Sequence, residues 1–440
     1  MSTAREAALR TLAACEKQGA WSDGYLKRIL RESGLDSRDA ALATRLCFGV
    51  LQNRLLLDWY LAQFCTTKLE KLDLNVLCIL RTAAYQLLFL DKIPPSAAVN
   101  EAVSLTKKYC RNPRAAGMVN AVLRAMLRSG QLPEPTGSDE LERLSIQYSH
   151  PRWLVETFAD RLGLAETEAL LAADNAQPPT TAQVNTFRAS AEEVASLLET
   201  EGVEVKPHPW LKDCLELSGT GDLERLRAYQ DGLFYVQDAA ARLAVTGLEL
   251  APGLRVLDCC AAPGGKSFAA AIDLKNRGEV HSCDIHPHKI KLLEAGRDRL
   301  GLDIVSPMLQ SAALRREDWV ERFDAVLCDV PCSGLGIIRK KPDIRYKDPG
   351  PLAGLPKVQR AILDNCCAYV RPGGTLLYAT CTLLRRENED VVETFLSNHP
   401  EFSLTPLALP IPGGENGMMT FWPHIHGTDG FFAARLTRKE

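Results

Sequence analysis

Apolar residues in the first 130 positions recur at the spacing of amphipathic helices. Between residues 7 and 50, leucine, alanine and valine return every three or four positions, with charged residues between them. Residues 75–90 are more continuously apolar, which is expected of a central helix that is covered on every side. Further helices are predicted over 97–110 and 117–127. We therefore predict a compact all-α domain over residues 1–130.

Residues 131–230 break this helical pattern. Residues 131–140, which include the segment QLPEPTGSD, are rich in proline, glycine and acidic side chains, so we predict a linker there. From 141 to 230 the two periodicities are mixed. Residues 181–187 alternate as a strand does, and residues 191–201 have helical spacing. We predict a small α/β subdomain over 141–230.

From residue 231 onward, short apolar strands alternate with glycine turns and helices. The predicted strands are Arg255–Cys259, Val280–Asp284, Ala325–Asp329 and Thr375–Ala379. This order is typical of a doubly wound, Rossmann-like sheet of parallel strands. Ligands bind such sheets at the carboxyl ends of the strands, so residues 231–440 are predicted to carry the active site.

The composition indicates a soluble protein that folds around ordinary cores. Hydrophobic residues make up 46% of the chain and charged residues 24%. No apolar run is long enough to cross a bilayer, and the first residues contain acidic side chains and no signal-type block. We expect a cytoplasmic protein that does not contact membranes. Its fourteen cysteines show no framework spacing, so most are expected to be small buried hydrophobic residues.

The charge is distributed unevenly. Residues 1–130 hold 19 Lys and Arg against 11 Asp and Glu, a net charge of +8, whereas the remainder holds 33 against 44, a net charge of −11. A basic module joined to an acidic one suggests that the front of the chain helps to hold a polyanion. Solvated helix faces would give the same counts, so charge alone leaves both interpretations open.

The turn after the first predicted strand carries the chemistry of a ligand-binding loop. Small residues and glycines let a ligand approach the backbone, and the following helix offers free N–H groups. A phosphate-binding loop would need glycine where Cys260 stands, and the three spaced glycines of a dinucleotide site are missing. A nucleoside ligand without a phosphate, such as S-adenosylmethionine, fits better. The candidate cofactor residues of this turn are Cys260, Ala261, Ala262, Pro263, Gly264, Gly265 and Lys266.

Two carboxylates end later strands at the same predicted edge. Asp284 is placed to accept hydrogen bonds from ribose hydroxyls, although an aspartate that caps the next helix would stand at the same position. Asp329 ends the following strand. Nearby, His281, Cys283, His286 and His288 suggest zinc, but no second ligand pair stands at finger spacing, so we predict no metal site.

Two cysteines follow strand ends. Cys332 lies in the segment DVPCSG and Cys381 in YATCT, and the topology brings both to the edge that holds the glycine turn. Beside a nucleoside pocket, this pair favours nucleophilic chemistry. Carbon 5 of cytosine becomes nucleophilic when a thiolate adds to carbon 6, and a polar group near ring N3 would stabilise the adduct. Asp329 and Lys266 are the candidates for that group.

These segments resemble the motifs of the RNA cytosine-5 methyltransferases. The resemblance rests on CAAPGGK, DVPCSG, YATCT and the triplet Gln237–Ala239, while GMVNAVLR at 117–124 is similar to the NusB-type RNA-binding fold. The combination resembles the bacterial 16S ribosomal RNA methyltransferases. It implies that Cys381 attacks carbon 6 and that Cys332 assists product release. It also implies that the all-α domain and the 141–230 subdomain bind RNA.

The resemblance further implies ligand contacts that the motifs alone do not give. Asp329 and Lys266 would hold the base, and Asp284 would bind the ribose of S-adenosylmethionine. Related chains usually have a Gly-Asp pair near position 310, where this chain has Gln310 and Ser311, so Gln310 or Ser311 is the candidate for the adenine contact. The basic run after the Cys332 loop would contact RNA phosphates and stack on a base. Its candidate residues are Arg339, Lys340, Lys341, Arg345 and Tyr346.

Several alternatives remain open at this point. A DNA cytosine methyltransferase would use Cys332 as its nucleophile. The substrate could be transfer RNA or another RNA, or the chain could be a non-catalytic RNA-binding assembly factor. We expect a monomer.

Overall fold

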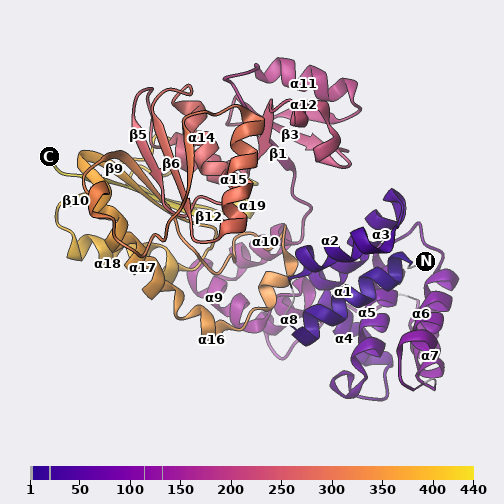
Figure 1. The fold of residues 1–440 in the computed structure, drawn as a ribbon. Helices are drawn as coiled ribbons and strands as arrows, with labels where there is room; N and C mark the ends of the chain where they lie inside the picture. Colours follow the sequence, from indigo (N-terminus) through magenta and orange to yellow (C-terminus); the bar gives the residue numbers. More distant parts are fainter. Residues whose placement is uncertain (1–2, 19–20, 113, 131) are drawn as a thin grey trace. The chain divides into compact units, whose positions relative to one another are not determined.

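The computed structural model describes residues 3–18, 21–112, 114–130 and 132–440, and the chain forms two compact units (Figure 1). The first unit contains the residues up to Ala176 together with Ile338–Lys347. The second contains Gln177–Ile337 and Asp348–Glu440. The chain therefore leaves the second unit after Ile337, adds one short segment to the first, and returns.

The first unit is built from helices. Its core forms around α5, where a continuous run of apolar and small side chains is buried, as the unbroken apolar pattern predicts. Asp73 accepts hydrogen bonds from the first N–H groups of this helix and caps it. The predicted all-α front domain is confirmed. Its helices are α1 (Ala4–Gln18), α2 (Ser22–Ser33), α3 (Ser37–Gln52), α4 (Arg54–Phe64), α5 (Leu74–Phe89), α6 (Pro95–Tyr109), α7 (Ala115–Arg128), α8 (Glu140–Tyr148), α9 (Arg152–Leu162) and α10 (Leu164–Asp174).

The three helices α8 to α10 group with the front of the chain. Helix α8 packs on α4, and the first strand of the molecule begins only at Thr180. The mixed pattern predicted from residue 141 is thus helical up to Asp174. The predicted linker starts at Gln131, which lies outside the described residues, and residues 132–138 form neither helix nor strand. The predicted domain boundaries stay a prediction.

The second unit begins with a small antiparallel sheet. Its strand order is β2-β3-β1-β4. Helix α11 (Ala191–Thr200) packs on this sheet and starts with a capping box, in which Ser190 and Glu193 satisfy each other's backbone N–H groups. The predicted α/β subdomain is confirmed as a fold. Its strands are β1 (Thr180–Val184), β2 (Glu204–Pro207), β3 (Cys214–Ser218) and β4 (Phe234–Val236).

A larger, mainly parallel sheet follows, as predicted. Its order is β10-β12-β9-β8-β5-β6-β7, and β11 pairs with β12. The strands from β9 to β7 are parallel, whereas β12 is antiparallel to β9. Four of the strands, β5, β6, β8 and β9, agree with the sequence-based prediction, which includes neither β7 nor the C-terminal antiparallel strands. The strands are β5 (Arg255–Asp258), β6 (Glu279–Asp284), β7 (Val305–Leu309), β8 (Phe323–Asp329), β9 (Val370–Thr380), β10 (Phe402–Leu404), β11 (Met418–Phe421) and β12 (Phe431–Arg438).

Helices cover both faces of this sheet. One face packs on α13 (Ala239–Thr246) and α14 (Gly265–Asp273), with α15 (Pro287–Leu300) alongside, and the other packs on α17 (Leu355–Cys366) and α18 (Glu389–Asn398). The parallel order brings the carboxyl ends of β5, β6, β8 and β9 to one edge (Figure 1). Among the described residues, no helix combines the length and apolar character that a membrane crossing needs.

Candidate active site

The two predicted cysteines meet at the carboxyl edge of the large sheet. Strands β8 and β9 are neighbours, and the loops that follow them carry Cys332 and Cys381 with their Sγ atoms 3.2 Å apart. The Gly336 N–H donates to the Cys381 carbonyl and ties the loops together. A Cβ on Gly336 would lie 1.8 Å from the Gly430 carbonyl oxygen, so only glycine allows this approach.

Two buried side chains from one short loop hold the cysteine loops in place. The Glu387 carboxylate accepts from the Ser333 N–H at 2.9 Å and from Gln359 Nε2 at 2.8 Å. Asn388 Nδ2 donates to the Thr382 carbonyl at 2.9 Å, and its Oδ1 accepts from the Thr380 hydroxyl. One carboxylate and one amide therefore fix the residues beside both sulfurs.

Sequence reasoning missed this supporting pair. Glu387 and Asn388 lie in the charged run RRENED, which has the composition of an exposed loop, yet both are fully buried. The only local signal is their closeness to Cys381 in the chain. Their role depends on contacts with α17, with β9 and with the loops that follow β8 and β9, which no local sequence pattern predicts.

The hydrogen bond between the sulfurs makes the two thiols unequal. The Cys332 thiol lowers the pKa of Cys381, against burial, which raises it, and the nearby Lys266 ammonium lowers it further. The same hydrogen bond and burial raise the pKa of Cys332 well above the usual thiol value. Cys381 is therefore the sulfur that more readily becomes a thiolate, the nucleophilic form.

Lys266 and Asp329 form an ion pair beside the sulfurs. The Nζ atom of Lys266 lies 2.7 Å from Oδ2 of Asp329. Burial lowers the pKa of Lys266, but the charge and hydrogen bond of Asp329 outweigh it and raise the pKa overall. Lys266 as a whole is 8% exposed, and its ammonium stays charged beside the two sulfurs. The sequence-predicted pair is thus brought together.

A cavity of about 560 Å³ opens at this edge of the sheet. The apolar side chains that line this cavity include Ile285, Val358 and Ile362. A pocket with one apolar side and a few converging polar groups is the usual form of a small-molecule site. The predicted site residues that line it are Cys260, Ala262, Asp284, Asp329, Cys332 and Cys381.

The predicted glycine turn is divided between this cavity and a second one. Gly264 precedes α14 with a φ of +116°, a conformation that favours glycine. The second cavity, of about 600 Å³, adjoins the first, since Ala262 and Asp329 line both. The turn residues that line the second are Ala261, Ala262, Pro263, Gly265 and Lys266.

The two predicted contacts to a nucleoside have different surroundings. Asp284 is buried at the cavity wall, accepts from the His286 N–H at 3.0 Å and lies 3.3 Å from Lys289 Nζ. Gln310 instead donates to the carbonyls of Ser311 and Leu314, and Ser311 lines the cavity. The structure thus offers Ser311 rather than Gln310 for a contact on this side.

The histidine and cysteine group near β6 does not converge. The His281 ring packs edge-on against Trp319 and Phe323, and its Nε2 lies 3.3 Å from Glu279. Cys283 is buried in the core on the α17 face of the sheet. Within the described residues, the group with metal-ligand spacing is a different one, Cys259, Cys328 and Cys366.

The structure corrects the role predicted for Arg345 and Tyr346. Arg345 is fully buried in the first unit, where its Nη1 donates to the carbonyls of Gln52 and Tyr148 and to Asn175 Oδ1. The Tyr346 hydroxyl donates to the Leu51 carbonyl, and its ring lies under the Arg54 guanidinium at 3.6 Å. The phosphate and stacking contacts predicted for these two are therefore wrong for this conformation, because both side chains pack inside a folded unit.

Three family models match successive parts of the chain. The model described as 16S rRNA methyltransferase RsmB/F matches residues 245–437. The NusB family matches residues 2–128, and a ferredoxin-like domain of RsmF/B-like methyltransferases matches residues 150–224.

Relatives cover the whole length. The probable ribosomal RNA small subunit methyltransferase B of Bacillus subtilis is 36% identical, over 100% of this chain and 99% of its own. The ribosomal RNA small subunit methyltransferase B of Salmonella paratyphi A is 31% identical, over 98% and 99%.

A solved structure shares the complete fold. The crystal structure of PH0851 superposes with a TM-score of 0.83 and 29% identity, over 99% of this chain and 98% of that one. The NSun6 structure from Pyrococcus horikoshii with SFG has a TM-score of 0.59 and 22% identity, over 66% of this chain and 98% of its own, which shows the fold alone. The chain therefore belongs to the RsmB/F family of S-adenosylmethionine-dependent RNA cytosine methyltransferases, with an N-terminal NusB domain.

Proposed function

We propose that this enzyme methylates carbon 5 of a cytosine in small-subunit ribosomal RNA through a covalent bond from Cys381 to carbon 6. One observation carries the proposal: two cysteine sulfurs 3.2 Å apart lie at a nucleoside-sized cavity, beside the ion pair of the buried Lys266 with the partly exposed Asp329. The names of the full-length relatives support ribosomal RNA as the substrate.

The residues around the first cavity fit S-adenosylmethionine. The buried Asp284 carboxylate can accept hydrogen bonds from ribose hydroxyls, and Ile285 and Ile362 offer apolar surface to an adenine ring. The small side chains of Cys260 and Ala262 leave room near the backbone. When bound, this cofactor supplies an electrophilic methyl group.

The side chains of the site then divide the work on the cytosine. The Cys381 thiolate adds to carbon 6, which places electron density on carbon 5 and makes that carbon nucleophilic. Lys266 donates a hydrogen bond to the ring as negative charge develops there, and Asp329 holds both Lys266 and the amino group of the base. Carbon 5 would take the methyl group as the bond between that methyl and the cofactor sulfur breaks, which leaves S-adenosylhomocysteine. After loss of the carbon 5 proton to a base, the bond to Cys381 breaks and the methylated cytosine is released.

The second cysteine serves the release step. Cys332 lies within hydrogen-bond distance of the Cys381 sulfur, and its raised pKa keeps it protonated. As a thiol it stabilises the leaving Cys381 thiolate by donating a hydrogen bond. In this proposal Cys381 attacks the base first, and Cys332 then assists the release of the product.

A mechanism-based trap tests the nucleophile. RNA with 5-fluorocytosine at the target cannot lose its carbon 5 substituent, so the covalent adduct should persist and peptide mapping should find it on Cys381. A matched DNA oligonucleotide is the control. A crosslink on Cys332, or one that forms only with DNA, would indicate a DNA-type cytosine methyltransferase and contradict the proposal.

The substrate needs its own experiment. Bisulfite mapping of RNA from cells that lack the protein should show one unmodified cytosine in small-subunit ribosomal RNA. Loss of methylation only in transfer RNA would refute the ribosomal target but keep the chemistry. No loss in any RNA would instead favour a non-catalytic assembly factor.

A further inference from the structure

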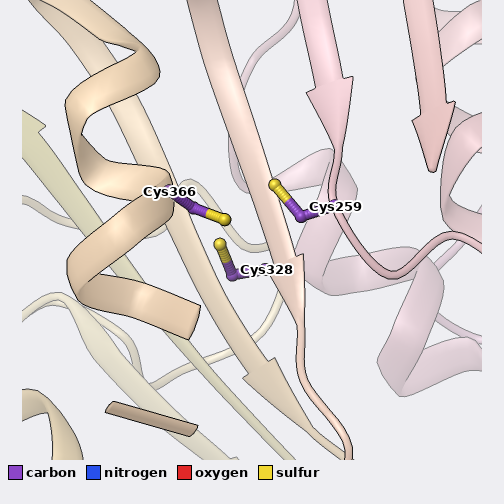
Figure 2. Close-up of side chains that lie close together, drawn as sticks. All are labelled: Cys259, Cys328 and Cys366. Carbon is purple, nitrogen blue, oxygen red and sulfur yellow. The ribbon is translucent and has the colours of Figure 1, made fainter. Parts of the chain in front are cut away.

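Three cysteines outside the proposed catalytic pair converge in the core of the second unit (Figure 2). Cys259 directly follows β5, Cys328 lies on the neighbouring strand β8, and Cys366 is the last residue of α17. Figure 2 shows their side chains pointing toward one another from these three elements. Their Sγ atoms all lie within 4.8 Å of one another.

The backbone determines this convergence. The Cys259 N–H donates to the Leu327 carbonyl at 2.9 Å, which continues the pairing of β5 with β8 by one residue. Helix α17 crosses the same face of the sheet and brings Cys366 above the two strands. A pyramidal central atom bonded to three sulfurs at about 2.3 Å would hold them about 3.5 Å apart, so the three sulfurs, which lie within 4.8 Å of one another, need to move closer only by side-chain rotation.

The surroundings of the cluster select against a charged complex. Cys328 and Cys366 are fully buried and Cys259 is 3% exposed, and the side chains that share their core include Leu257, Val326 and Leu363. A divalent ion with three thiolates would leave a net negative charge in this apolar core, which is costly. A trivalent ion with three thiolates is neutral.

We propose that Cys259, Cys328 and Cys366 form a soft-ion site that binds trivalent arsenic as a neutral tris-thiolate. Arsenous acid, As(OH)₃, supplies the ion. Each thiol gives its proton to one hydroxide of the acid, three arsenic–sulfur bonds replace three arsenic–oxygen bonds, and three water molecules leave. No oxidation or reduction takes place.

A route to the cluster leads through the first cavity. Cys259 lines that cavity together with Ile362, which lies four residues before Cys366 on α17. The cluster therefore lies directly behind the cavity wall. If the cavity holds the cofactor, as the proposed function states, a bound cofactor should slow the entry of arsenic.

Native mass spectrometry of the whole protein with arsenite tests the site. The protein is kept in a phosphine reductant, which does not compete as a thiol would. The expected product gains one arsenic and loses three hydrogens. Cys366→Ala should abolish this product, whereas Cys367→Ala should leave it unchanged, because Cys367 is the neighbouring buried cysteine outside the cluster.

The same spectrum separates the cluster from the Cys332–Cys381 pair. Arsenic bound by only two thiols keeps one hydroxide and therefore gives a product of different mass. If that product forms and disappears in Cys332→Ala, the arsenic is bound by the proposed catalytic pair and the proposal is overturned. Absence of any product, or a three-sulfur product that survives in Cys366→Ala, would also overturn it. Cys328→Ala provides a second variant if Cys366→Ala does not fold.

The entry route is tested by protection. S-adenosylhomocysteine at saturation should slow arsenite uptake at least several-fold, and unchanged uptake would exclude the cavity as the route. Binding of S-adenosylhomocysteine is measured separately by calorimetry. If it does not bind, the proposed cofactor site fails while the mass result for the arsenic site still stands.

Discussion

At the scale of single residues, the site depends on a difference in pKa between two cysteines that have the same side chain. Cys332 and Cys381 have the same chemistry, yet one hydrogen bond lowers the pKa of Cys381 and raises that of Cys332. Lys266 adds a nearby positive charge on the Cys381 side. The direction of attack is therefore a property of the pair and its surroundings.

Replacing each cysteine should separate bond formation from bond breakage. Cys332→Ala removes the donor that stabilises the leaving thiolate, so a covalent RNA adduct should accumulate in the presence of the cofactor. Cys381→Ala should form no adduct. Denaturing gels with labelled RNA measure both outcomes, and equal adduct from the two variants would refute the assigned roles.

Asp258 at the end of β5 should make stability depend on pH. Burial raises its pKa to about 7, against a hydrogen bond from Ser267 that lowers it. Since this value lies above the unfolded value of 3.8, the stabilisation from proton binding is complete below the unfolded pKa and is lost as pH rises through about 7.

The Asp258→Asn variant reports this contribution directly. From about pH 5 to about pH 8, wild type should lose roughly 2–3 kcal/mol of unfolding free energy relative to the variant. Urea titrations at several pH values measure the difference. Asp303→Asn, at an exposed aspartate, is the control, and an equal slope in both comparisons would contradict the prediction.

At the scale of elements, the site is held by the short loop before α18. Glu387 and Asn388 reach the loops after β8 and β9, and Tyr378 of β9 donates to the Glu387 carbonyl at 2.6 Å. Buried polar networks of this kind are sensitive because each lost partner leaves another group unsatisfied.

Glu387→Gln should impair catalysis more than it impairs folding. The Ser333 N–H and Gln359 Nε2 both donate to one carboxylate oxygen, Oε2, and a neutral amide oxygen accepts such hydrogen bonds more weakly than a carboxylate, so the Cys332 loop should loosen. We expect kcat to fall by about tenfold to a hundredfold, as a loss of about 1–3 kcal/mol implies. Single-turnover methylation measures it, and Glu393→Gln on the exposed face of α18 should retain wild-type kcat.

Helices and strands with a regular apolar face could be predicted from the sequence, whereas the C-terminal antiparallel strands could not. The period of apolar residues predicted the helices around α5 and the parallel strands β5, β6, β8 and β9, because each buries a regular face. Strand ends then located Cys332, Cys381, Asp284 and Asp329, since parallel topology brings those ends together. The antiparallel strand β12 is not part of an alternation of strand, glycine turn and helix, so the pattern that predicts the parallel strands does not predict it.

At the scale of the whole molecule, the segment Ile338–Lys347 belongs to the first unit although it follows the Cys332 loop of the second. Arg345 is its main anchor, through hydrogen bonds to carbonyls of the first unit. Its burial could not be predicted, because a run of basic residues has the same composition whether it faces solvent or fills a core. Lys340 and Lys341 of the same run are exposed, and their contact with RNA phosphates stays a prediction.

Substitutions in this run should separate stability from RNA binding. Arg345→Ala leaves buried carbonyls without their donor, so we expect a loss of about 2–4 kcal/mol and a lower Tm. Lys341→Ala should leave Tm unchanged but reduce the salt dependence of RNA affinity by about one counterion. Calorimetry and binding titrations at several salt concentrations measure the two, and an unchanged Tm for Arg345→Ala would contradict the assigned anchor.

The split course of the chain restricts how this architecture can be rearranged. A fragment that ends after Ala176 lacks the segment Ile338–Lys347, which belongs to the first unit. A fragment that begins at Gln177 contains this segment but lacks the helices on which it packs. Gene fusion or exchange at a single junction therefore cannot transplant either half intact. A successful graft of either unit therefore needs two coordinated junctions, one near Ala176 and one around Ile338–Lys347.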